Sequence, residues 1–270
     1  MGGPVRTVVV TLAHGRHDHL AAQAAALART PADAHVVVAM ADPDLPAVVP
    51  DADVVHVQLD QGCLPLAAAR NAGVARSREL GAELMVLLDV DCLPSSRLLE
   101  RYRAAAVAYD GVLCGPVGYL PPRPPGGYPA TGLRDLAVPH PARPVPGEDE
   151  VLPAPEPDLF WSLSFALTPA TWDRVGGFCE DYRGYGGEDT DFGHAAARAG
   201  VATWWVGGAW AFHQHHGAGG TPLQHAEDIL RNARVFRDRW GWWPMLGWLE
   251  DLRAAGLAQL DASGMWTASP

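Results

Sequence analysis

The stretch Leu84-Met85-Val86-Leu87-Leu88-Asp89-Val90-Asp91 joins a run of large apolar residues to two carboxylates spaced i and i+2. A continuous apolar run of this kind predicts a strand buried on both faces, as in a parallel sheet. Strand alternation places Asp89 and Asp91 on the same side of the chain. Ligands of open parallel sheets bind at the carboxyl ends of the strands, so both aspartates are candidate site residues.

Two interpretations of this aspartate pair are open. A hard divalent metal that carries an oxygen-rich ligand, such as a diphosphate, would balance two carboxylates at a buried strand end. Alternatively, the aspartates precede the helix that follows Pro94-Ser95-Ser96, where negative charge is favourable. This segment alone does not decide between a metal site and a helix start.

Outward from this strand, strand-like and helix-like segments alternate. This order predicts an α/β fold with a mostly parallel sheet flanked by helices. The Pro-rich segment 119–157 interrupts the order and predicts an irregular functional loop or linker without core secondary structure. Strands are expected at 5–11, 35–40, 54–58, 84–88, 112–117, 160–167 and 202–206, and helices at 18–28, 66–80, 95–109, 168–175, 189–199 and 225–239.

Composition limits the class of protein. The chain has 270 residues and a net charge of -11, which argues against a general nucleic-acid binder. All 20 basic residues are arginine, which excludes a Walker-type lysine or a Schiff base. No apolar run approaches the roughly 20 residues of a membrane span, and the start of the sequence lacks a long apolar secretion segment. Its four cysteines lack metal or CxxC spacing, so reduced thiols and a cytoplasmic location are expected.

A second acidic motif is Gly184-Tyr185-Gly186-Gly187-Glu188-Asp189-Thr190-Asp191. Its glycines allow unusual backbone angles and close approach to a ligand. A glycine-rich turn with acidic helix capping explains one or two of the carboxylates. Three carboxylates beside an aromatic ring favour a sugar site instead, with one carboxylate as general base toward a hydroxyl.

The third motif is His213-Gln214-His215-His216, which follows the apolar run 204–212. Neutral imidazole is a common metal ligand, and alternation would put His213 and His215 on one face. A solvated polar turn is the alternative. Three neighbouring histidines after a predicted strand favour at least one metal ligand.

These motifs together resemble a known family. Leu87-Leu88-Asp89-Val90-Asp91-Cys92-Leu93-Pro94 resembles the Asp-x-Asp metal motif of GT-A glycosyltransferases. Val175-Gly176-Gly177-Phe178 with the 184–191 motif resembles the C-terminal region of β-1,4-galactosyltransferases, which recurs in bacterial members of glycosyltransferase family 2. Ala69-Arg70-Asn71-Ala72-Gly73 is similar to the family 2 helix start after the third strand.

The resemblance implies a GT-A fold and a metal-dependent inverting glycosyltransferase. It would move a hexose (galactose, N-acetylgalactosamine or glucose) from a UDP-sugar to a hydroxyl of a small-molecule, glycan or peptide acceptor. Residues 1–118 would bind the nucleotide sugar, 119–224 would carry acceptor binding and catalysis, and 225–270 would add a C-terminal helical segment. A retaining transferase, a nucleotidyltransferase and a catalytically silent sugar-nucleotide-binding protein are the alternatives.

The resemblance also implies roles for individual residues. Asp189 would be the inverting base, and Glu188 would hydrogen-bond a sugar. Asp91 and Asp89 would hold Mn²⁺ or Mg²⁺, with His213, favoured over His215, completing the metal shell. The remaining donor-binding candidates are Thr11, Ala13, Arg16, Asp42, Arg70, Tyr185 and Gly187.

Overall fold

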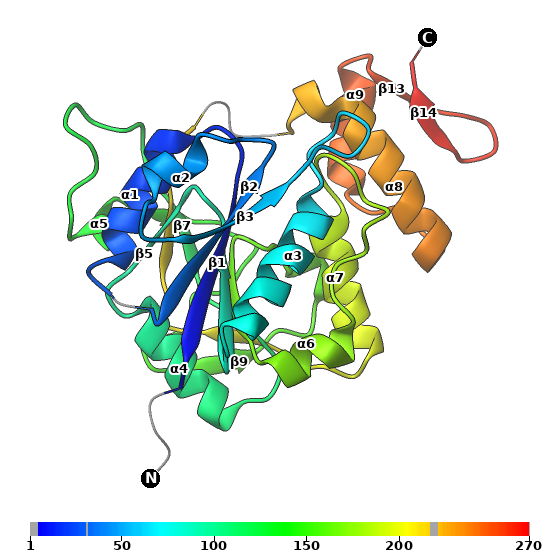
Figure 1. The fold of residues 1–270 in the computed structure, drawn as a ribbon. Helices are drawn as coiled ribbons and strands as arrows, with labels where there is room; N and C mark the ends of the chain where they lie inside the picture. Colours follow the sequence, from blue (N-terminus) through cyan, green and yellow to red (C-terminus); the bar gives the residue numbers. More distant parts are fainter. Residues whose placement is uncertain (1–4, 31, 217–220, 270) are drawn as a thin grey trace.

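An eight-stranded mixed sheet forms the centre of the molecule (Figure 1), with strand order β3-β2-β1-β4-β10-β6-β11-β9. The structure is a computed structural model and describes residues 5–30, 32–216 and 221–269. The outer limits of the predicted donor-binding part and C-terminal segment, residues 1 and 270, lie outside the described residues. The first elements are β1 (Thr7–Ala13), α1 (His17–Leu27), β2 (Ala34–Met40), α2 (Leu45–Val48), β3 (Asp53–Val57), α3 (Leu66–Glu79), β4 (Leu84–Leu88), β5 (Cys92–Pro94) and α4 (Leu98–Ala108).

The predicted buried strand is β4, whose five residues are all buried. Strands β3, β2, β1 and β4 run parallel. Strand β10 (Ser164–Leu167) then pairs antiparallel with both β4 and β6 (Val112–Cys114). The expected α/β fold with a mostly parallel sheet is confirmed, and the antiparallel strand β10 separates its two parallel parts.

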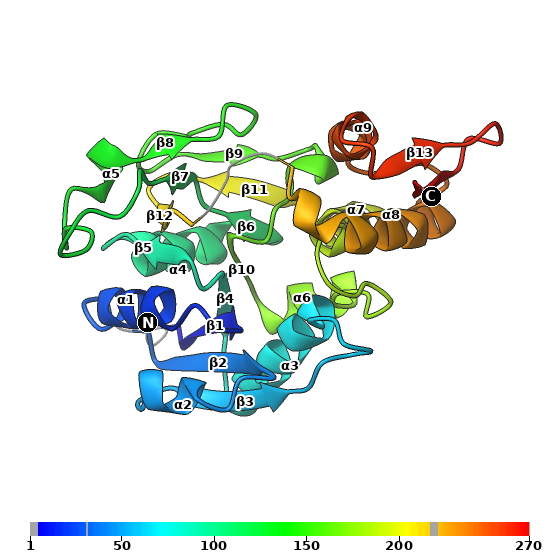
Figure 2. The same ribbon diagram turned by 90° about the horizontal axis from the view of Figure 1, so that it is seen from above.

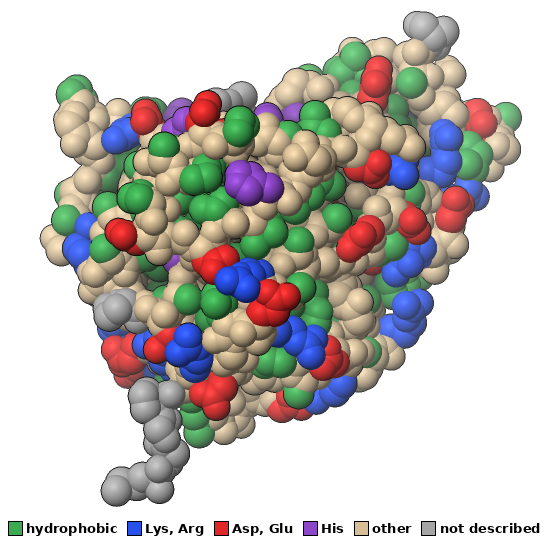
Figure 3. All heavy atoms as spheres, viewed as in Figure 1, with side chains coloured by type: hydrophobic (Ala, Val, Ile, Leu, Met, Phe, Trp, Pro, Cys, Tyr) green, Lys and Arg blue, Asp and Glu red, His purple; other side chains and the backbone are tan. Residues whose placement is uncertain are grey.

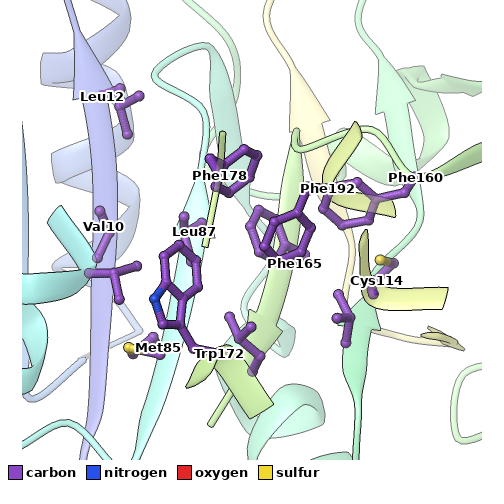
Figure 4. Close-up of a cluster of buried hydrophobic side chains, with 14 of the residues drawn as sticks. Val10, Leu12, Met85, Leu87, Cys114, Phe160, Phe165, Trp172, Phe178 and Phe192 are labelled. Atoms are coloured by element: carbon purple, nitrogen blue, oxygen red, sulfur yellow. The ribbon is translucent and has the colours of Figure 1, made fainter. Parts of the chain in front are cut away.

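Helices cover both faces of this sheet (Figure 2). Helices α3, α6 (Pro169–Val175) and α7 (Glu188–Arg198) lie on one face, and α1 and α4 lie on the other. On the α7 face, the ring of Phe192 stacks on Phe178 with centroids 4.4 Å apart. Figure 4 shows these rings packed against Phe160, Phe165 and Trp172. This aromatic core fixes α7, whose first turn carries Glu188 and Asp189.

A second, four-stranded sheet has the order β5-β12-β7-β8. The prediction of one strand over 112–117 was wrong, because the chain leaves the central sheet at Gly115-Pro116 and enters the second sheet as β7 (Val117–Tyr119). Gly115 allows this crossing, since a Cβ there would lie 2.0 Å from the carbonyl oxygen of Ala209. The other strands are β12 (Ala211–His213) and β8 (Val138–Pro139).

The Pro-rich segment 119–157 contributes to both sheets, which corrects the expectation that it lacks core secondary structure. Its strand β9 (Val151–Pro153) pairs antiparallel with β11 (Thr203–Val206) at the edge of the central sheet. Proline is tolerated at a sheet edge, where no further strand needs its missing N–H. The segment also contains α5 (Leu133–Leu136) and ends at the first residue of η1 (Pro157–Leu159).

The C-terminal part packs beside α7 through its own apolar cluster. It consists of η2 (Leu223–His225), α8 (Ala226–Trp240), α9 (Leu246–Ala254) and a hairpin of β13 (Ala258–Leu260) and β14 (Trp266–Ala268). Among the described residues, none of the helices combines the length and apolar character of a membrane span. Figure 3 shows acidic and basic side chains intermixed on the face in view, without a continuous basic surface there.

Candidate active site

The candidate site lies where β4, β5, β12 and α7 meet. Asp89 and Asp91 lie between β4 and β5, at the carboxyl end of β4. Strand β12 pairs antiparallel with β5 in a register that places His213 opposite Cys92. The N–H of Gln214 donates to the carbonyl oxygen of Asp91 at 2.7 Å. Sheet pairing therefore brings the histidine motif to the aspartate motif from a distant part of the sequence.

Three side chains form a potential metal site: Asp91, His213 and His216. One ligand atom from each lies within 4.8 Å of the others. Nε2 of His216 lies 2.9 Å from Oδ2 of Asp91, and Nε2 of His213 lies 3.5 Å from Oδ1. Nε2 of His216 is buried, and no well-aligned hydrogen-bond partner for it occurs within the described residues. The three ligand atoms therefore converge closely enough to hold one metal ion.

The charge states of Asp91 and His213 also suit a metal. Burial opposes the ionisation of Asp91, but contact with His216 and the proximity of His213 and Arg16 outweigh it and hold its pKa at about 2. Burial lowers the pKa of His213, which favours neutral imidazole. A carboxylate and imidazole nitrogens are ligands that suit a divalent first-row metal such as Mn²⁺.

This set differs from the predicted ligands at two positions. His215 is exposed, and its backbone N–H donates to the hydroxyl of Tyr128. Strand alternation does not extend to His215 because β12 ends at His213, and the turn that follows directs His216 to the site. Asp89 lies 3.5 Å from Nη2 of Arg70 instead of joining the histidines.

A second charged group surrounds Arg70, which is buried. Its Nη1 donates to Oε1 of Glu188 at 2.8 Å, while its Nη2 faces Asp89. Oε2 of Glu188 is buried, and the described chain offers it no hydrogen-bond partner. Arg70 thus contacts both Asp89, after β4, and Glu188, at the start of α7. Its single positive charge leaves part of their negative charge unbalanced.

Burial, together with repulsion between these carboxylates, raises the pKa values of two of them. Burial and the charge of Glu188 raise the pKa of Asp189 to about 6, against the opposing charge of Arg70. Burial also raises the pKa of Asp89 to about 7, with Asp91 and Glu188 adding repulsion. Oδ1 of Asp189 accepts the N–H of Thr190 at 2.7 Å, which orients this carboxyl at the start of α7. A partly buried carboxyl with a pKa near neutrality is suited to general-base catalysis.

The other members of the glycine-rich motif have structural contacts. Asp191 accepts hydrogen bonds from Arg239, Trp240 and Tyr182, so it joins α7 to α8. The half-exposed ring of Tyr185 stacks on His225 from the C-terminal part, with centroids 4.9 Å apart. Gly187 adopts φ 92° directly before α7, a conformation that favours glycine.

The predicted nucleotide-binding residues lie around the loop after β1. Thr11 is fully buried, and its hydroxyl donates to Gln23. Ala13 is buried at the end of β1. Asp42 accepts the N–H of Gly15 at 2.8 Å, so its carboxylate holds this loop.

Arg16, in the same loop, connects it with the metal site. It adopts a left-handed conformation with φ 50°, and its Nη1 lies 3.3 Å from Oδ2 of Asp91. Of the predicted nucleotide-binding residues, Arg16 and Arg70 contact the predicted acidic residues directly, whereas the side chains of Thr11 and Asp42 are used within the protein.

Sequence reasoning missed one unusual cation, Arg143 in the Pro-rich segment. It is buried, and its guanidinium carbon lies 4.5 Å from the ring centre of Trp205 and 5.2 Å from that of Trp161. No described residue accepts a hydrogen bond from its Nη1 or Nη2. Burial accordingly lowers its pKa. Nothing in the local sequence, His140-Pro141-Ala142-Arg143, indicates that the two rings would enclose it.

Comparison with known proteins agrees with this geometry. A family model described as "N-terminal domain of galactosyltransferase" matches residues 156–215, which include Glu188, Asp189 and His213. A search of curated proteins finds no match. The similarity in sequence to this family therefore covers residues 156–215, which contain the glycine-rich acidic motif and part of the histidine motif.

Solved structures extend the similarity to the whole fold. Mannosyltransferase PcManGT from Pyrobaculum calidifontis, in complex with GDP-Man and Mn²⁺, has a TM-score of 0.54 and 17% identity over 93% of this chain and 76% of its own. S. aureus TarS 1-349 has a TM-score of 0.57 and 14% identity over 86% of this chain and 66% of its own. GalNAc-T7 with UDP, GalNAc and Mn²⁺ has a TM-score of 0.58 and 12% identity over 93% of this chain and 57% of its own.

At these identities, the solved structures establish the fold. The expected GT-A glycosyltransferase fold with a galactosyltransferase-like segment is confirmed. The expected enzyme class, a glycosyltransferase, agrees with both kinds of comparison.

Proposed function

We propose that this protein is a metal-dependent inverting glycosyltransferase that moves a hexose from a UDP-sugar to a hydroxyl acceptor. Galactose, N-acetylgalactosamine and glucose are the sugars considered, and the acceptor is a small molecule, a glycan or a peptide. One observation carries the proposal: a potential metal site at Asp91 and a carboxyl of raised pKa at Asp189 meet at the same end of β4.

The chemistry assigned to Asp189 is removal of a proton from the acceptor. Its carboxylate takes the hydroxyl proton as the acceptor oxygen bonds to the anomeric carbon. The bond from that carbon to the diphosphate breaks with its electron pair on the leaving oxygen, so an in-line displacement inverts the anomeric centre. A base whose pKa lies just below neutral pH is mostly ionised yet still basic enough to act.

Asp91, His213 and His216 would hold Mn²⁺ or Mg²⁺, which when bound supplies positive charge for the leaving diphosphate. Asp89, Asp91, Glu188 and Asp189 outnumber the two arginines beside them, Arg16 and Arg70, which supports a cation requirement. Arg16 is suited to contact the donor diphosphate, since its side chain already reaches the metal site.

Neighbouring residues are assigned to donor and acceptor. Glu188, fixed by Arg70, leaves one oxygen for a sugar hydroxyl. Thr11, Ala13, Asp42, Tyr185 and Gly187 remain proposed contributors, with Thr11 and Asp42 acting through the shape of the nucleotide loop. The proposal also retains the division into residues 1–118 for donor binding, 119–224 for acceptor and catalysis, and 225–270 as a helical segment. A cytoplasmic location is proposed as well, and the four free cysteines support it.

A panel of nucleotide sugars with and without Mn²⁺, read by thermal shift, tests the donor. The panel contains UDP-galactose, UDP-N-acetylgalactosamine, UDP-glucose and GDP-mannose, because the solved relatives include a complex with GDP-Man. A ligand that binds the native state raises its melting temperature by mass action. If no nucleotide sugar raises it in the presence of metal, the proposed function is wrong.

Product stereochemistry separates the two transferase mechanisms. NMR of the anomeric configuration should show inversion, and retention would favour the retaining alternative. Release of pyrophosphate from a nucleoside triphosphate and a sugar phosphate would instead indicate a nucleotidyltransferase. Tight donor binding without turnover across a broad acceptor panel would indicate a silent binding protein.

A further inference from the structure

The loop 183–187 directly precedes Glu188 and Asp189 but belongs to no helix or strand. Its backbone polar groups therefore need partners from elsewhere in the protein. The N–H of Gly184 donates to the carbonyl oxygen of Leu64, and the N–H of Tyr185 donates to Asp228 on α8. These two hydrogen bonds give the N–H groups of Gly184 and Tyr185 their acceptors.

Most of the remaining contacts come from one side chain, Asn232 of α8, which is fully buried. Its Nδ2 lies 3.0 Å from the carbonyl oxygen of Arg183, 3.3 Å from that of Tyr185 and 2.8 Å from that of Gly186. Its Oδ1 accepts the N–H of Arg183 at 3.2 Å. An asparagine offers two N–H donors and one oxygen acceptor, so this residue uses all of its hydrogen-bonding groups on the loop.

The loop 183–187 also packs closely against its neighbours at two glycines. A Cβ at Gly187 would lie 3.6 Å from Cβ of Asn232 and 3.1 Å from the ring of Tyr182. A Cβ at Gly184 would lie 2.1 Å from the carboxylate of Asp228. Helix α8 thus fits closely against glycine backbone, and the loop conformation depends on it.

We propose that Asn232 is a positioning residue for Asp189, holding the loop 183–187 so that the first turn of α7 presents its carboxylates to the substrate. This inference rests on the proposed function and assigns a role to a residue outside the galactosyltransferase-like segment 156–215. The C-terminal helix is then part of the active-site framework, although it contains none of the predicted reacting groups.

Two variants test the role of Asn232. Asn232→Asp keeps the size and the acceptor oxygen but replaces the donor with a second oxygen that faces three carbonyls. Asn232→Ala removes all of the contacts. Leu252→Ala is the matched control, because Leu252 is fully buried in the same C-terminal cluster and belongs to α9.

The first measurement is amide hydrogen exchange across residues 180–192 of the full chain, which does not depend on activity. Both Asn232 variants should lose protection at Arg183, at Tyr185 and in the first turn of α7. Leu252→Ala should lose protection in the C-terminal cluster and leave this stretch unchanged. Unaltered exchange of 180–192 in both Asn232 variants would overturn the inference.

The second measurement is Mn²⁺-dependent hydrolysis of UDP-galactose, with water as the acceptor. Both Asn232 variants should lower kcat about tenfold to a hundredfold, the size expected when a reacting group moves by about 1 Å. The KM for UDP-galactose should stay within about twofold, because Asn232 does not contact the metal side of the site. A change in KM equal to that in kcat, or an equal loss of kcat in Leu252→Ala, would indicate general destabilisation and overturn the positioning role.

The two measurements separate the failure of each proposal. Wild-type protein without turnover of any nucleotide sugar would contradict the proposed function, while the exchange experiment would still decide whether Asn232 holds the loop. Normal turnover in Asn232→Asp, together with disturbed exchange, would show that the loop is held but that its position does not limit the reaction. That result would overturn the assignment of Asn232 as a positioning residue for Asp189.

Discussion

The two ends of the candidate site shift the pKa values of their carboxylates in opposite directions. At Asp91, two imidazoles and Arg16 favour the charged form and hold the pKa at about 2. At Asp189, burial and Glu188 disfavour the charged form and raise the pKa to about 6. The first environment suits a permanent anion that binds a cation, and the second suits a group that exchanges a proton. Carboxyls of the same kind thus acquire different roles from their surroundings.

The largest effect is expected for Asp189→Asn. Transfer should fall by about a factor of 10² to 10⁴, the usual contribution of a general base. Donor binding in the presence of Mn²⁺, measured by calorimetry, should stay within about twofold, because Asp91 and the histidines are intact. A variant that keeps more than a tenth of wild-type activity would remove Asp189 from the role of base.

The metal end is tested by comparing neighbouring histidines. His216→Ala should weaken Mn²⁺ binding by about a hundredfold, since it removes one of three converging ligands. His215→Ala is the control and should change the affinity by less than about twofold, because His215 is exposed and lies outside the group. Titration calorimetry with Mn²⁺ measures both. Equal losses in the two variants would show that the turn rearranges when metal binds.

Stability should respond to the two aspartates with opposite signs. The pKa of Asp189 is raised in the folded state, so its cost is absent below about pH 4 and complete above about pH 6. Asp189→Asn should therefore stabilise metal-free protein by about 3 kcal/mol at pH 7. The pKa of Asp91 is lowered, so its contribution is present above about pH 4 and is lost as the pH falls toward 2.

Asp91→Asn should accordingly destabilise the metal-free protein by about 2 kcal/mol at pH 7. Urea unfolding in the presence of a chelator measures both variants, and repeating it at pH 4 should abolish the gain from Asp189→Asn. Changes of the same sign at pH 7 would mean that the two ends do not differ in the way proposed.

The smallest expected effect is the pH dependence of the wild-type rate. If Asp189 must be ionised, the rate at saturating Mn²⁺ and donor should rise with pH around a midpoint of about 6. Between pH 7 and pH 5 it should fall about tenfold, in proportion to the ionised fraction. Asp189→Asn should have a low rate without this midpoint, whereas the same midpoint in that variant would assign it to another group.

Local sequence patterns predicted much of the fold but less of the site. Continuous apolar runs such as Leu84–Leu88 identify buried strands because burial on both faces removes the need for polar residues. Strand β9 was not predicted, because its proline disguises a short edge strand that depends on its partner β11. Tertiary pairing, rather than local propensity, forms such elements.

Within the site, residues predicted from the same motif lie close together. The structure differs from the prediction where the backbone turns after a strand. Alternation favoured His215, but the strand ends at His213, so His216 reaches Asp91 instead. Asn232 lies in an amphipathic helix whose sequence gives no sign that its amide serves a loop about fifty residues earlier. Such roles depend on which elements pack together, and only the folded chain reveals them.

The pairing of β5 with β12 also has a kinetic consequence. It joins segments far apart in the sequence, so the site of Asp91, His213 and His216 forms only after a large loop has closed. Contacts of such long range are costly to form early, and the complete ligand set should be absent from the folding transition state. A metal that binds there would leave the folding rate nearly unchanged and lengthen the lifetime of the native protein by slowing unfolding.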